Sequence, residues 1–392
     1  MREVVIVDAV RTAIGKRNGA LSGIRSDELL GSLLNHLVNE RVGIDPELIE
    51  DFVCGCVTQI GEQAMDVGRN AVLVGGLPIS IPGVTLNRHC GSSQQAIVFA
   101  ANTIAAGEMD VVLAGGIENM SRTPMGSDGM GDHLAHLGFG IGPKLFERFG
   151  GIVPQGMSAE LIAEKWGLSR TELDEFGKRS NELAIAAMDA GLYDKEIMPV
   201  EVTDAEGNTF TFDRDEGPRR GVDLEKMATL KTPFKQDGVV TAGNSSQISD
   251  GASAVLLMSM DKCRELGLTP RARYVCTALT GEDPILMLTG PITATPKVLA
   301  KAGLTMKDID VFEINEAFAS VVLAWVKELD PPDLDKLNPW GGAIANGHPL
   351  GASGGKLTCT LLSELEHFGG RYGLQSMCMG MGMGIATIYE RI

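Results

Sequence analysis

The sequence predicts an α/β protein built from two similarly folded halves. Short β-branched runs alternate with helical patterns along the chain, which is typical of α/β folds. The 392 residues include 49 glycines and 17 prolines but only 5% aromatic residues, a composition that suits many tight connections between strands and helices. The third observation is that distant parts of the chain resemble one another at a constant offset.

Six short runs are predicted to be buried strands because they are rich in β-branched residues. These runs are residues 4–10, 51–57, 109–116, 253–259, 272–278 and 384–390. Between the first two, residues 26–43 have a helical pattern that we expect to begin at a Ser26 cap, with Glu28 nearby, and to end at Gly43. Strands that alternate with helices predict a largely parallel sheet in each half.

The internal repeat relates residues 42–52 to residues 302–312, 260 positions later. At this offset Gly43 aligns with Gly303, Ile49 with Ile309 and Phe52 with Phe312, and Gly91-Ser92-Ser93 aligns with Gly351-Ala352-Ser353. Two segments in one register indicate a duplicated unit. In such a pair of halves, Cys90 occupies nearly the place of His348.

Residues from about 119 to 248 have a different character. They contain an irregular Gly- and Met-rich stretch, a pair of helical patterns and a polar hairpin pattern, at residues 125–151, 158–190 and 201–213. We expect an insertion that covers a functional site, since long structured insertions are often functional. The predicted domains are an N-terminal half (1–118 with 249–268), an inserted loop domain (119–248) and a C-terminal half (269–392).

Composition excludes several classes of protein. The formal net charge of -17 argues against nucleic-acid binding, which requires concentrated Lys and Arg. No segment reaches the ~18 apolar residues that a membrane-spanning helix needs. The N-terminus enters a strand-like run at once, which leaves no room for a leader, and "YERI" at the C-terminus is no peroxisomal signal.

The seven cysteines show no disulfide framework, because their number is odd and their spacing is unpaired. This pattern predicts a reducing compartment, and we expect a cytoplasmic protein. The only close pair, Cys54 and Cys56, lacks further His or Cys ligands nearby, so no metal site is expected.

Cys90 stands in "NRHCGSSQQA", just before a helical pattern that ends at Gly107. A thiol at the N-terminus of a helix meets exposed backbone N–H groups, which should lower its pKa from roughly 8.5. The simpler alternative is a small buried hydrophobic residue, which is what a single cysteine usually is.

Two further elements carry candidate groups. His348 lies between glycine and proline in a turn that leads into a helix, a setting that projects the imidazole, although a single histidine is more often structural. Asn315 and Glu316 directly follow a predicted strand, a usual position for polar site residues in α/β folds.

The segment "SMCMGMGMGIA" alternates methionine with cysteine or glycine over residues 376–386. If it is extended, one face carries Met377, Met379, Met381 and Met383, and the other carries Cys378, Gly380, Gly382 and Gly384. The Cys378 side chain would then lie on a strand face whose other residues are glycines, where a ligand can approach closely. A copper(I) site made of the methionines is the alternative, but a packed strand face explains the pattern more simply.

Together these motifs resemble the thiolase family. They appear in that family's order and span almost the whole chain, at residues 87–96, 115–124, 243–252, 315–319, 347–354 and 378–380. The resemblance implies an α/β fold of duplicated βαβαβαββ domains, which form a five-layer αβαβα core with an inserted loop domain. It also implies a homodimer or homotetramer.

The resemblance further implies an acyltransferase that cleaves 3-oxoacyl-CoA with coenzyme A, or condenses acetyl-CoA in the reverse direction. Cys90 would be the nucleophile, His348 would take its proton, and Cys378 would be the second acid and base. One oxyanion hole would be formed by His348 with a water held by Asn315, and the other by the backbone N–H groups of Cys90 and Gly380.

Coenzyme A would be a co-substrate, with no tightly bound cofactor. By resemblance, Ser246 lies near the pantetheine and Arg219 near the nucleotide phosphates. One departure from the family is Met381, which interrupts the consecutive glycines usual after the second cysteine. Two stretches, "GKRNGALSG" and "CGCVTQIGEQ", look more like degradative thiolases.

Three alternatives remain beside a degradative thiolase. A biosynthetic acetyl-CoA acetyltransferase would use the same residues to make acetoacetyl-CoA. A ketosynthase of the same superfamily would pair the cysteine with two histidines, and Cys378 in place of the second disfavours it. A protein that only binds acyl-CoA is disfavoured because all three reactive residues are present. The preferred acyl group and the direction stay open.

Overall fold

The first half of the chain follows the order βαβαβαββ. The computed structural model describes residues 1–129, 138, 140–204 and 206–392, so that part of the irregular stretch 125–151 lies outside the described residues. The elements of this half are β1 (Val4–Thr12), α1 (Ser26–Asn35), β3 (Asp51–Gly55), α2 (Val67–Val74), β4 (Val84–Leu86), α3 (Ser92–Ala106), β5 (Val111–Asn119) and β9 (Ser249–Ser259). A short strand β2 (Gly15–Lys16) pairs with β9.

The second half repeats this order. Its elements are β10 (Ala272–Gly281), α9 (Gly290–Ala302), β11 (Val311–Ile314), α10 (Ala319–Leu329), α11 (Ala343–Asn346), α12 (Ser353–Phe368), β12 (Tyr372–Met379) and β13 (Met383–Arg391). A parallel bridge from Leu337 to Phe312 stands where β4 lies in the first half. β3 and β11 begin at positions that the predicted offset of 260 residues relates.

The strands form half-sheets of matching order, β4-β3-β5-β9-β1 and β11-β12-β13-β10. β3 pairs in parallel with β4 and β5, but β9 is antiparallel to both β5 and β1, and β13 to both β12 and β10. β1 therefore runs in the same direction as β3, β4 and β5, and β10 in the same direction as β11 and β12. The prediction of largely parallel sheets holds for these strands and is wrong for β9 and β13. Each half-sheet is mixed because its last strand runs against the others: β9 returns to the sheet after the insertion, and β13 follows β12 through a tight turn.

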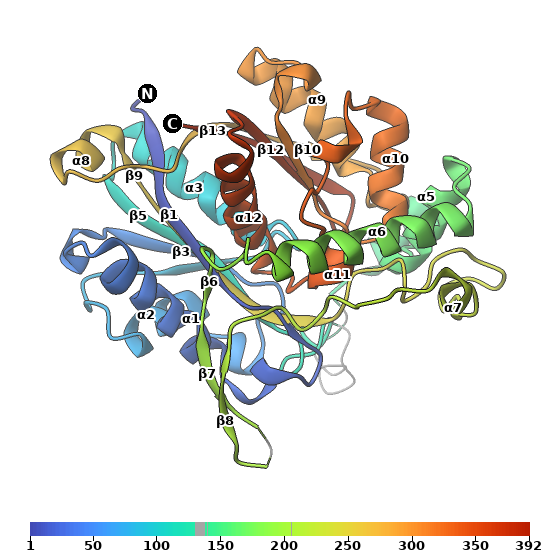
Figure 1. The fold of residues 1–392 in the computed structure, drawn as a ribbon, viewed down its shortest axis with the longest axis horizontal. Coiled ribbons are helices and arrows are strands. Elements are labelled where there is room, and N and C mark those ends of the chain that lie inside the picture. The colour runs from blue at the N-terminus through green and yellow to red at the C-terminus, as the bar shows by residue number, and fades with distance from the viewer. Residues whose placement is uncertain (130–137, 139, 205) are drawn as a thin grey trace.

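Five layers result from this arrangement (Figure 1), and the predicted fold class is confirmed. α1 and α2 cover the outer face of the first half-sheet, and α9 and α10 cover that of the second. α3 and α12 pack on each other between the half-sheets. β1 and β10 pair at Val5–Arg273 and Ile6–Ala272, which joins the half-sheets at their edges.

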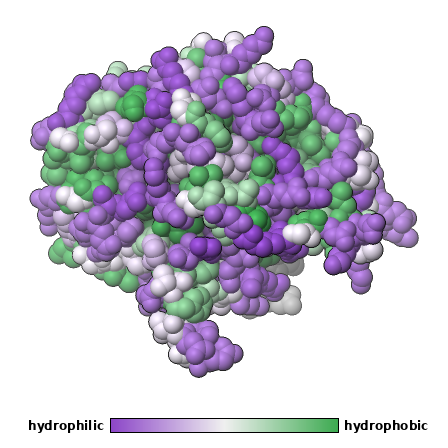
Figure 2. Space-filling model, in the orientation of Figure 1, coloured by the Kyte–Doolittle hydropathy of each residue, from purple (hydrophilic) through white to green (hydrophobic). Residues whose placement is uncertain are grey.

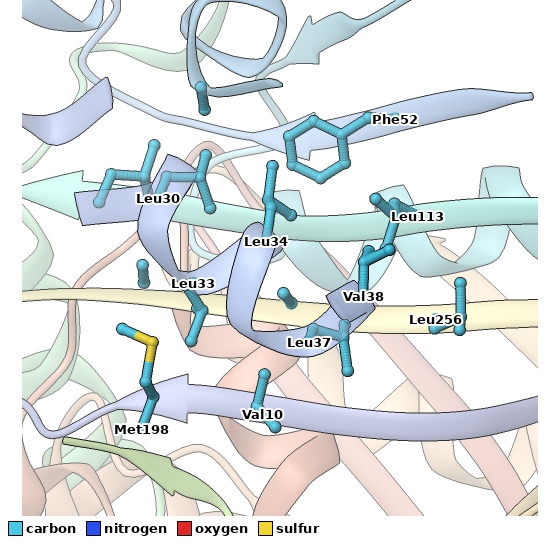
Figure 3. Packing of buried hydrophobic residues seen from close by; sticks show 14 of the residues in the cluster. Val10, Leu30, Leu33, Leu34, Leu37, Val38, Phe52, Leu113, Met198 and Leu256 are labelled. Carbon is cyan, nitrogen blue, oxygen red and sulfur yellow. The ribbon is translucent and has the colours of Figure 1, made fainter. Parts of the chain in front are cut away.

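The outer helix α1 buries one face by its 3- and 4-residue spacing of leucines (Figure 3). Its contacts with the sheet include Val10, Phe52, Leu113 and Leu256. The helix ends in a π-helical stretch, His36–Val42, closed by Gly43 with φ of 69°. The predicted cap is wrong, because the N-cap is Arg25 and the Ser26 hydroxyl donates to Gln63 Oε1 instead (3.2 Å).

The segment between β5 and β9 contains the predicted helix pair and hairpin. Its elements are α4 (Pro143–Phe149), α5 (Gln155–Lys165), α6 (Arg170–Asp189), β6 (Ile197–Met198), β7 (Val200–Thr203), β8 (Thr209–Phe212) and α7 (Leu224–Ala228). α5 and α6 pack against α10 of the second half, while β7 and β8 project from the body (Figure 1). α8 (Met260–Glu265) follows β9. The predicted domain boundaries stay a prediction.

The surface agrees with the acidic composition. Figure 2 shows hydrophilic residues over most of the viewed face, with smaller hydrophobic areas between them. Within the described ranges, no helix is long and apolar enough to cross a bilayer.

Candidate active site

A tight turn presents Cys90 at the start of α3. His89 adopts φ of 48°, a left-handed conformation that non-glycine residues rarely take. The turn is stabilised because the His89 N–H donates to Asn87 Oδ1 (2.8 Å), the Arg88 N–H donates to Ser92 Oγ (2.9 Å), and the Ser92 hydroxyl donates to the His89 carbonyl (2.6 Å). α3 begins at Ser92 and ends at Ala106, and the predicted Gly107 forms its C-cap with φ of 89°.

The expected lowering of the Cys90 pKa is wrong. The side chain is only 3% exposed, and burial raises the pKa of the thiol to about 11. Hydrogen bonds from the backbone N–H groups of Cys90 and Gly380 and from the Gln155 side chain lower this pKa, but by less. Removal of water from the sulfur thus outweighs the N–H groups at the helix end.

His348 is a buried, neutral imidazole. Burial first, and then the nearby Lys356 ammonium, lower the pKa of His348 to about 3. Its backbone N–H donates to Ser249 Oγ (3.1 Å). Its ring nitrogens lie 2.5 Å from Ser353 Oγ (Nδ1) and 3.3 Å from Asn315 Nδ2 (Nε2). The ring is therefore held on both sides by polar groups.

Cys378 lies near the end of β12, opposite Gly384 of β13. Burial, and then the neighbouring Cys90 sulfur, raise the pKa of the Cys378 thiol. The expected single extended segment is interrupted, because β12 ends at Met379 and residues 380–382 turn the chain back into β13. Met381 has φ of 62° in this turn, so it does not continue the strand face that Met377 and Met379 share.

Contacts between the halves bring Cys90 near Cys378 and pack the loop that carries His348 against the same cluster. Gly91 packs so closely on Met379 that an added Cβ would lie 2.3 Å from its sulfur. Leu350, two residues after His348, packs in the same hydrophobic cluster as Cys90 and Met379. Asn315 follows β11, and its N–H donates to the carbonyl of Ser376 in β12 (2.9 Å).

Ser246 and Arg219 lie farther out. The Ser246 N–H donates to the Ala317 carbonyl (3.0 Å), and the next residue, Gln247, accepts from the His348 N–H (3.3 Å), so Ser246 borders the histidine loop. Arg219 is exposed, and its backbone N–H donates to Asn181 Oδ1 (2.9 Å). The neighbouring Arg220 pairs with Asp189, whereas among the described residues the Arg219 guanidinium takes part in no ion pair.

Glu118, for which the sequence predicts no role, is fully buried at the end of β5. Its carboxylate accepts from the N–H groups of Val57 (2.9 Å), Thr58 (3.1 Å) and Gly351 (2.9 Å), and from the Gln63 side chain (2.9 Å). Glu118 thereby ties a loop of the first half to the histidine loop of the second. The signal for Glu118 in the sequence is a charged residue at the end of an apolar strand, which needs polar partners if it is buried.

Comparison with known proteins agrees with the fold and the motifs. The thiolase N-terminal domain model matches residues 4–261, and the thiolase C-terminal domain model matches residues 268–391. A steroid 3-ketoacyl-CoA thiolase of Mycobacterium tuberculosis is 48% identical over all of this chain and 95% of its own length. A 3-ketoacyl-CoA thiolase of Vibrio cholerae is 44% identical over the full length of both chains.

Among solved structures, an acetyl-CoA acetyltransferase of Bacillus anthracis superposes with a TM-score of 0.91, at 36% identity over 100% of this chain and 99% of that one. The fold and the paired domains define an acyltransferase that uses acyl-CoA substrates. The chain belongs to the thiolase family. Its reaction is the CoA-dependent cleavage of a 3-oxoacyl-CoA to acetyl-CoA and a shortened acyl-CoA.

Proposed function

We propose that this thiolase works in the degradative direction through an acyl group carried on Cys90. The observation that supports this most is the pairing of two buried sulfurs, Cys90 and Cys378, with Gly380 donating its N–H to Cys90. A neutral His348 imidazole completes the set, since a neutral ring can accept a proton.

In the first half-reaction, the Cys90 thiol gives its proton to His348 and the sulfur bonds to C3 of the 3-oxoacyl-CoA. The C2–C3 bond then breaks, and the Cys378 thiol protonates C2, which releases acetyl-CoA. In the second half-reaction, the Cys378 thiolate takes the proton of a CoA thiol, and the CoA sulfur attacks the acyl carbon. The Cys90 sulfur leaves and recovers its proton from His348.

Negative charge develops on a carbonyl oxygen in both half-reactions, and fixed N–H groups are expected to stabilise it. The backbone N–H groups of Cys90 and Gly380 supply one such oxyanion hole. His348, once protonated, and a water held by Asn315 supply the other. In the resting site the thiol and the imidazole are both neutral, so the charged pair forms only as substrate reacts.

Ser246 and Arg219 are proposed to hold CoA. Ser246 borders the histidine loop, which suits a contact with the pantetheine arm next to the thioester. Arg219 is exposed and unpaired within the described residues, so its guanidinium is available for a phosphate. The seven free, buried cysteines support a cytoplasmic protein, and the family resemblance supports a homodimer or homotetramer.

A loss of activity in Cys90→Ser tests the nucleophile. Wild-type protein with acetoacetyl-CoA and CoA should consume the 3-oxoacyl absorbance, and intact mass should show an acyl adduct on Cys90. Cys90→Ser should reduce the rate by at least ~10³-fold. Cys263→Ser, a matched thiol change in the peripheral helix α8, should retain the wild-type rate. An unchanged rate in Cys90→Ser would end the assignment.

The second candidate is a biosynthetic acetyl-CoA acetyltransferase, which the Bacillus anthracis structural relative favours. A profile of kcat/KM over short, long, branched and polycyclic 3-oxoacyl-CoA substrates separates the two. A degradative enzyme should prefer a substrate longer or bulkier than acetoacetyl-CoA. Highest kcat/KM for acetoacetyl-CoA, together with rapid condensation of acetyl-CoA, would favour the biosynthetic candidate.

A further inference from the structure

Ser353, the first residue of α12, lies against the catalytic histidine. Its side chain is buried, at 1% exposure. Its Oγ is 2.5 Å from His348 Nδ1 and 2.7 Å from the carbonyl oxygen of Pro349. On the other side of the ring, Asn315 Nδ2 is 3.3 Å from Nε2. These three polar contacts can be hydrogen bonds only if the imidazole, the Ser353 hydroxyl or the Asn315 amide supplies a proton to each of them.

Only one arrangement of these protons makes all three contacts hydrogen bonds. The Pro349 carbonyl can only accept, so the single Ser353 proton points toward it. Ser353 Oγ then accepts from His348 Nδ1–H, and the bare Nε2 accepts from the Asn315 amide. With the proton on Nε2 instead, Ser353 must donate to Nδ1, which leaves its oxygen 2.7 Å from the Pro349 carbonyl oxygen without a proton between them.

We propose that Ser353 is a positioning residue that fixes His348 in the Nδ1–H tautomer. This inference rests on the proposed role of His348 as the base for Cys90. A proton can be accepted only by the ring nitrogen that does not already carry one, and Ser353 keeps Nε2, the nitrogen on the Asn315 side, in that state. When Nε2 gains the proton, Nδ1–H still donates to Ser353, so the same contact supports both charge states.

The hydroxyl is held by the turn that precedes α12. Its donation to Pro349, four residues earlier, locks the side-chain rotamer at the first turn of α12. Ser363 makes the same kind of bond on the same helix, donating to the Cys359 carbonyl (3.0 Å), but it has no contact with His348. Ser363→Ala is therefore a matched control, because it removes this backbone bond and a long contact from Arg271 (3.4 Å) but nothing at His348.

The test measures the tautomer directly in full-length protein carrying ¹⁵N-labelled histidine. Long-range ¹H–¹⁵N spectra of the wild type should show His348, identified by its absence in His348→Asn, as the Nδ1–H tautomer. Ser353→Ala should shift this signal toward the Nε2–H tautomer and lower kcat ~10- to 100-fold, with KM changed less than ~3-fold. Ser363→Ala should leave the tautomer and kcat unchanged.

Two results would overturn the inference without touching the proposed function. The first is an Nε2–H tautomer of His348 in the wild type, a measurement that needs no variant. The second is a Ser353→Ala protein that keeps both the Nδ1–H signal and the wild-type kcat. Failure of the proposed function looks different, because His348→Asn would then retain activity whatever the tautomer.

Discussion

Cys90 shows how two opposite influences on one side chain are resolved. The helix N-terminus and the N–H of Gly380 stabilise a thiolate, whereas burial removes the water that would solvate it. Burial is the larger influence, so the resting nucleophile is a thiol. The resting site therefore contains no Cys90 thiolate, and it depends on His348 to remove the thiol proton when substrate is present.

The pH dependence of Cys90 alkylation tests this balance. Since burial raises the pKa of Cys90 to about 11, the thiolate fraction should rise about tenfold per pH unit from pH 7 to 10. The rate of iodoacetamide labelling, measured at the Cys90 peptide by mass spectrometry, should follow this slope. Free cysteine, with a pKa of roughly 8.5, should level off above about pH 9. A Cys90 rate that levels off below pH 8 would contradict the prediction.

The hairpin of β12 and β13 connects the second thiol to the first. Its turn is formed by Gly380, Met381 and Gly382, of which Met381 and Gly382 have left-handed φ angles of 62° and 75°. Gly380 cannot carry a larger side chain easily, because an added Cβ would lie 3.1 Å from His89 Nδ1. Gly382 is restricted more severely, because a Cβ there would lie 2.6 Å from the Glu282 carbonyl oxygen. The tight turn therefore keeps Gly380 close to Cys90.

Substitution of Met381 by valine tests the strain in this turn. A β-branched residue is poorly tolerated at positive φ, so Met381→Val should reduce the free energy of unfolding by ~1–2 kcal/mol. Met381→Gly should change it by less than ~0.5 kcal/mol, since relief of strain offsets the greater freedom of the unfolded chain.

The matched change Met383→Val lies in strand β13, where β-branched residues are favoured, and should cost less than Met381→Val. Thermal or urea unfolding of the three variants measures the differences. Equal losses for both valine variants would show that the turn conformation is not the cause.

Across the molecule, a buried ion network joins all three predicted domains. Arg11, at the end of β1, donates to Glu196 Oε1 (2.6 Å) and to both carboxylate oxygens of Asp215 (2.7 and 3.1 Å). Glu196 and Asp215 lie in the inserted segment, and Thr360 of α12 also donates to Glu196 (3.0 Å). Arg11 is completely buried, so each of its partners depends on it for compensation of charge.

Removal of this guanidinium should destabilise the whole protein. Arg11→Met leaves two buried carboxylates without a cation and should cost ~3–5 kcal/mol. Arg2→Met removes a partly exposed arginine that pairs with Asp110 and donates to the carbonyls of Ile104 and Met109, and it should cost less than Arg11→Met because water can solvate the groups left behind. Unfolding midpoints of the two variants give the comparison. Similar shifts in both would show that the buried network does not hold the inserted segment in place.

Much of the fold could be predicted from local pattern. The β-branched runs and the glycine that ends α3 depend on residues close together in the chain, and the repeat at 260 residues needs only a comparison of the sequence with itself, so the alternation of strands and helices was correct. The direction of β9 and β13 was not, because pairing direction depends on how the chain returns to the sheet. The prediction of a Ser26 cap was wrong because the Ser26 hydroxyl donates to Gln63, a residue from another segment of the chain.

The sequence by itself determined which chemical groups this thiolase has: the Cys90, His348 and Cys378 motifs, their order and the small residues around them. Only the tertiary structure decided their state. Burial raises one pKa and lowers another, Ser353 orients the imidazole, and Glu118 joins loops from both halves. The physical reason is that desolvation and hydrogen bonding depend on neighbours that are distant in the chain and become adjacent only when the two halves pack.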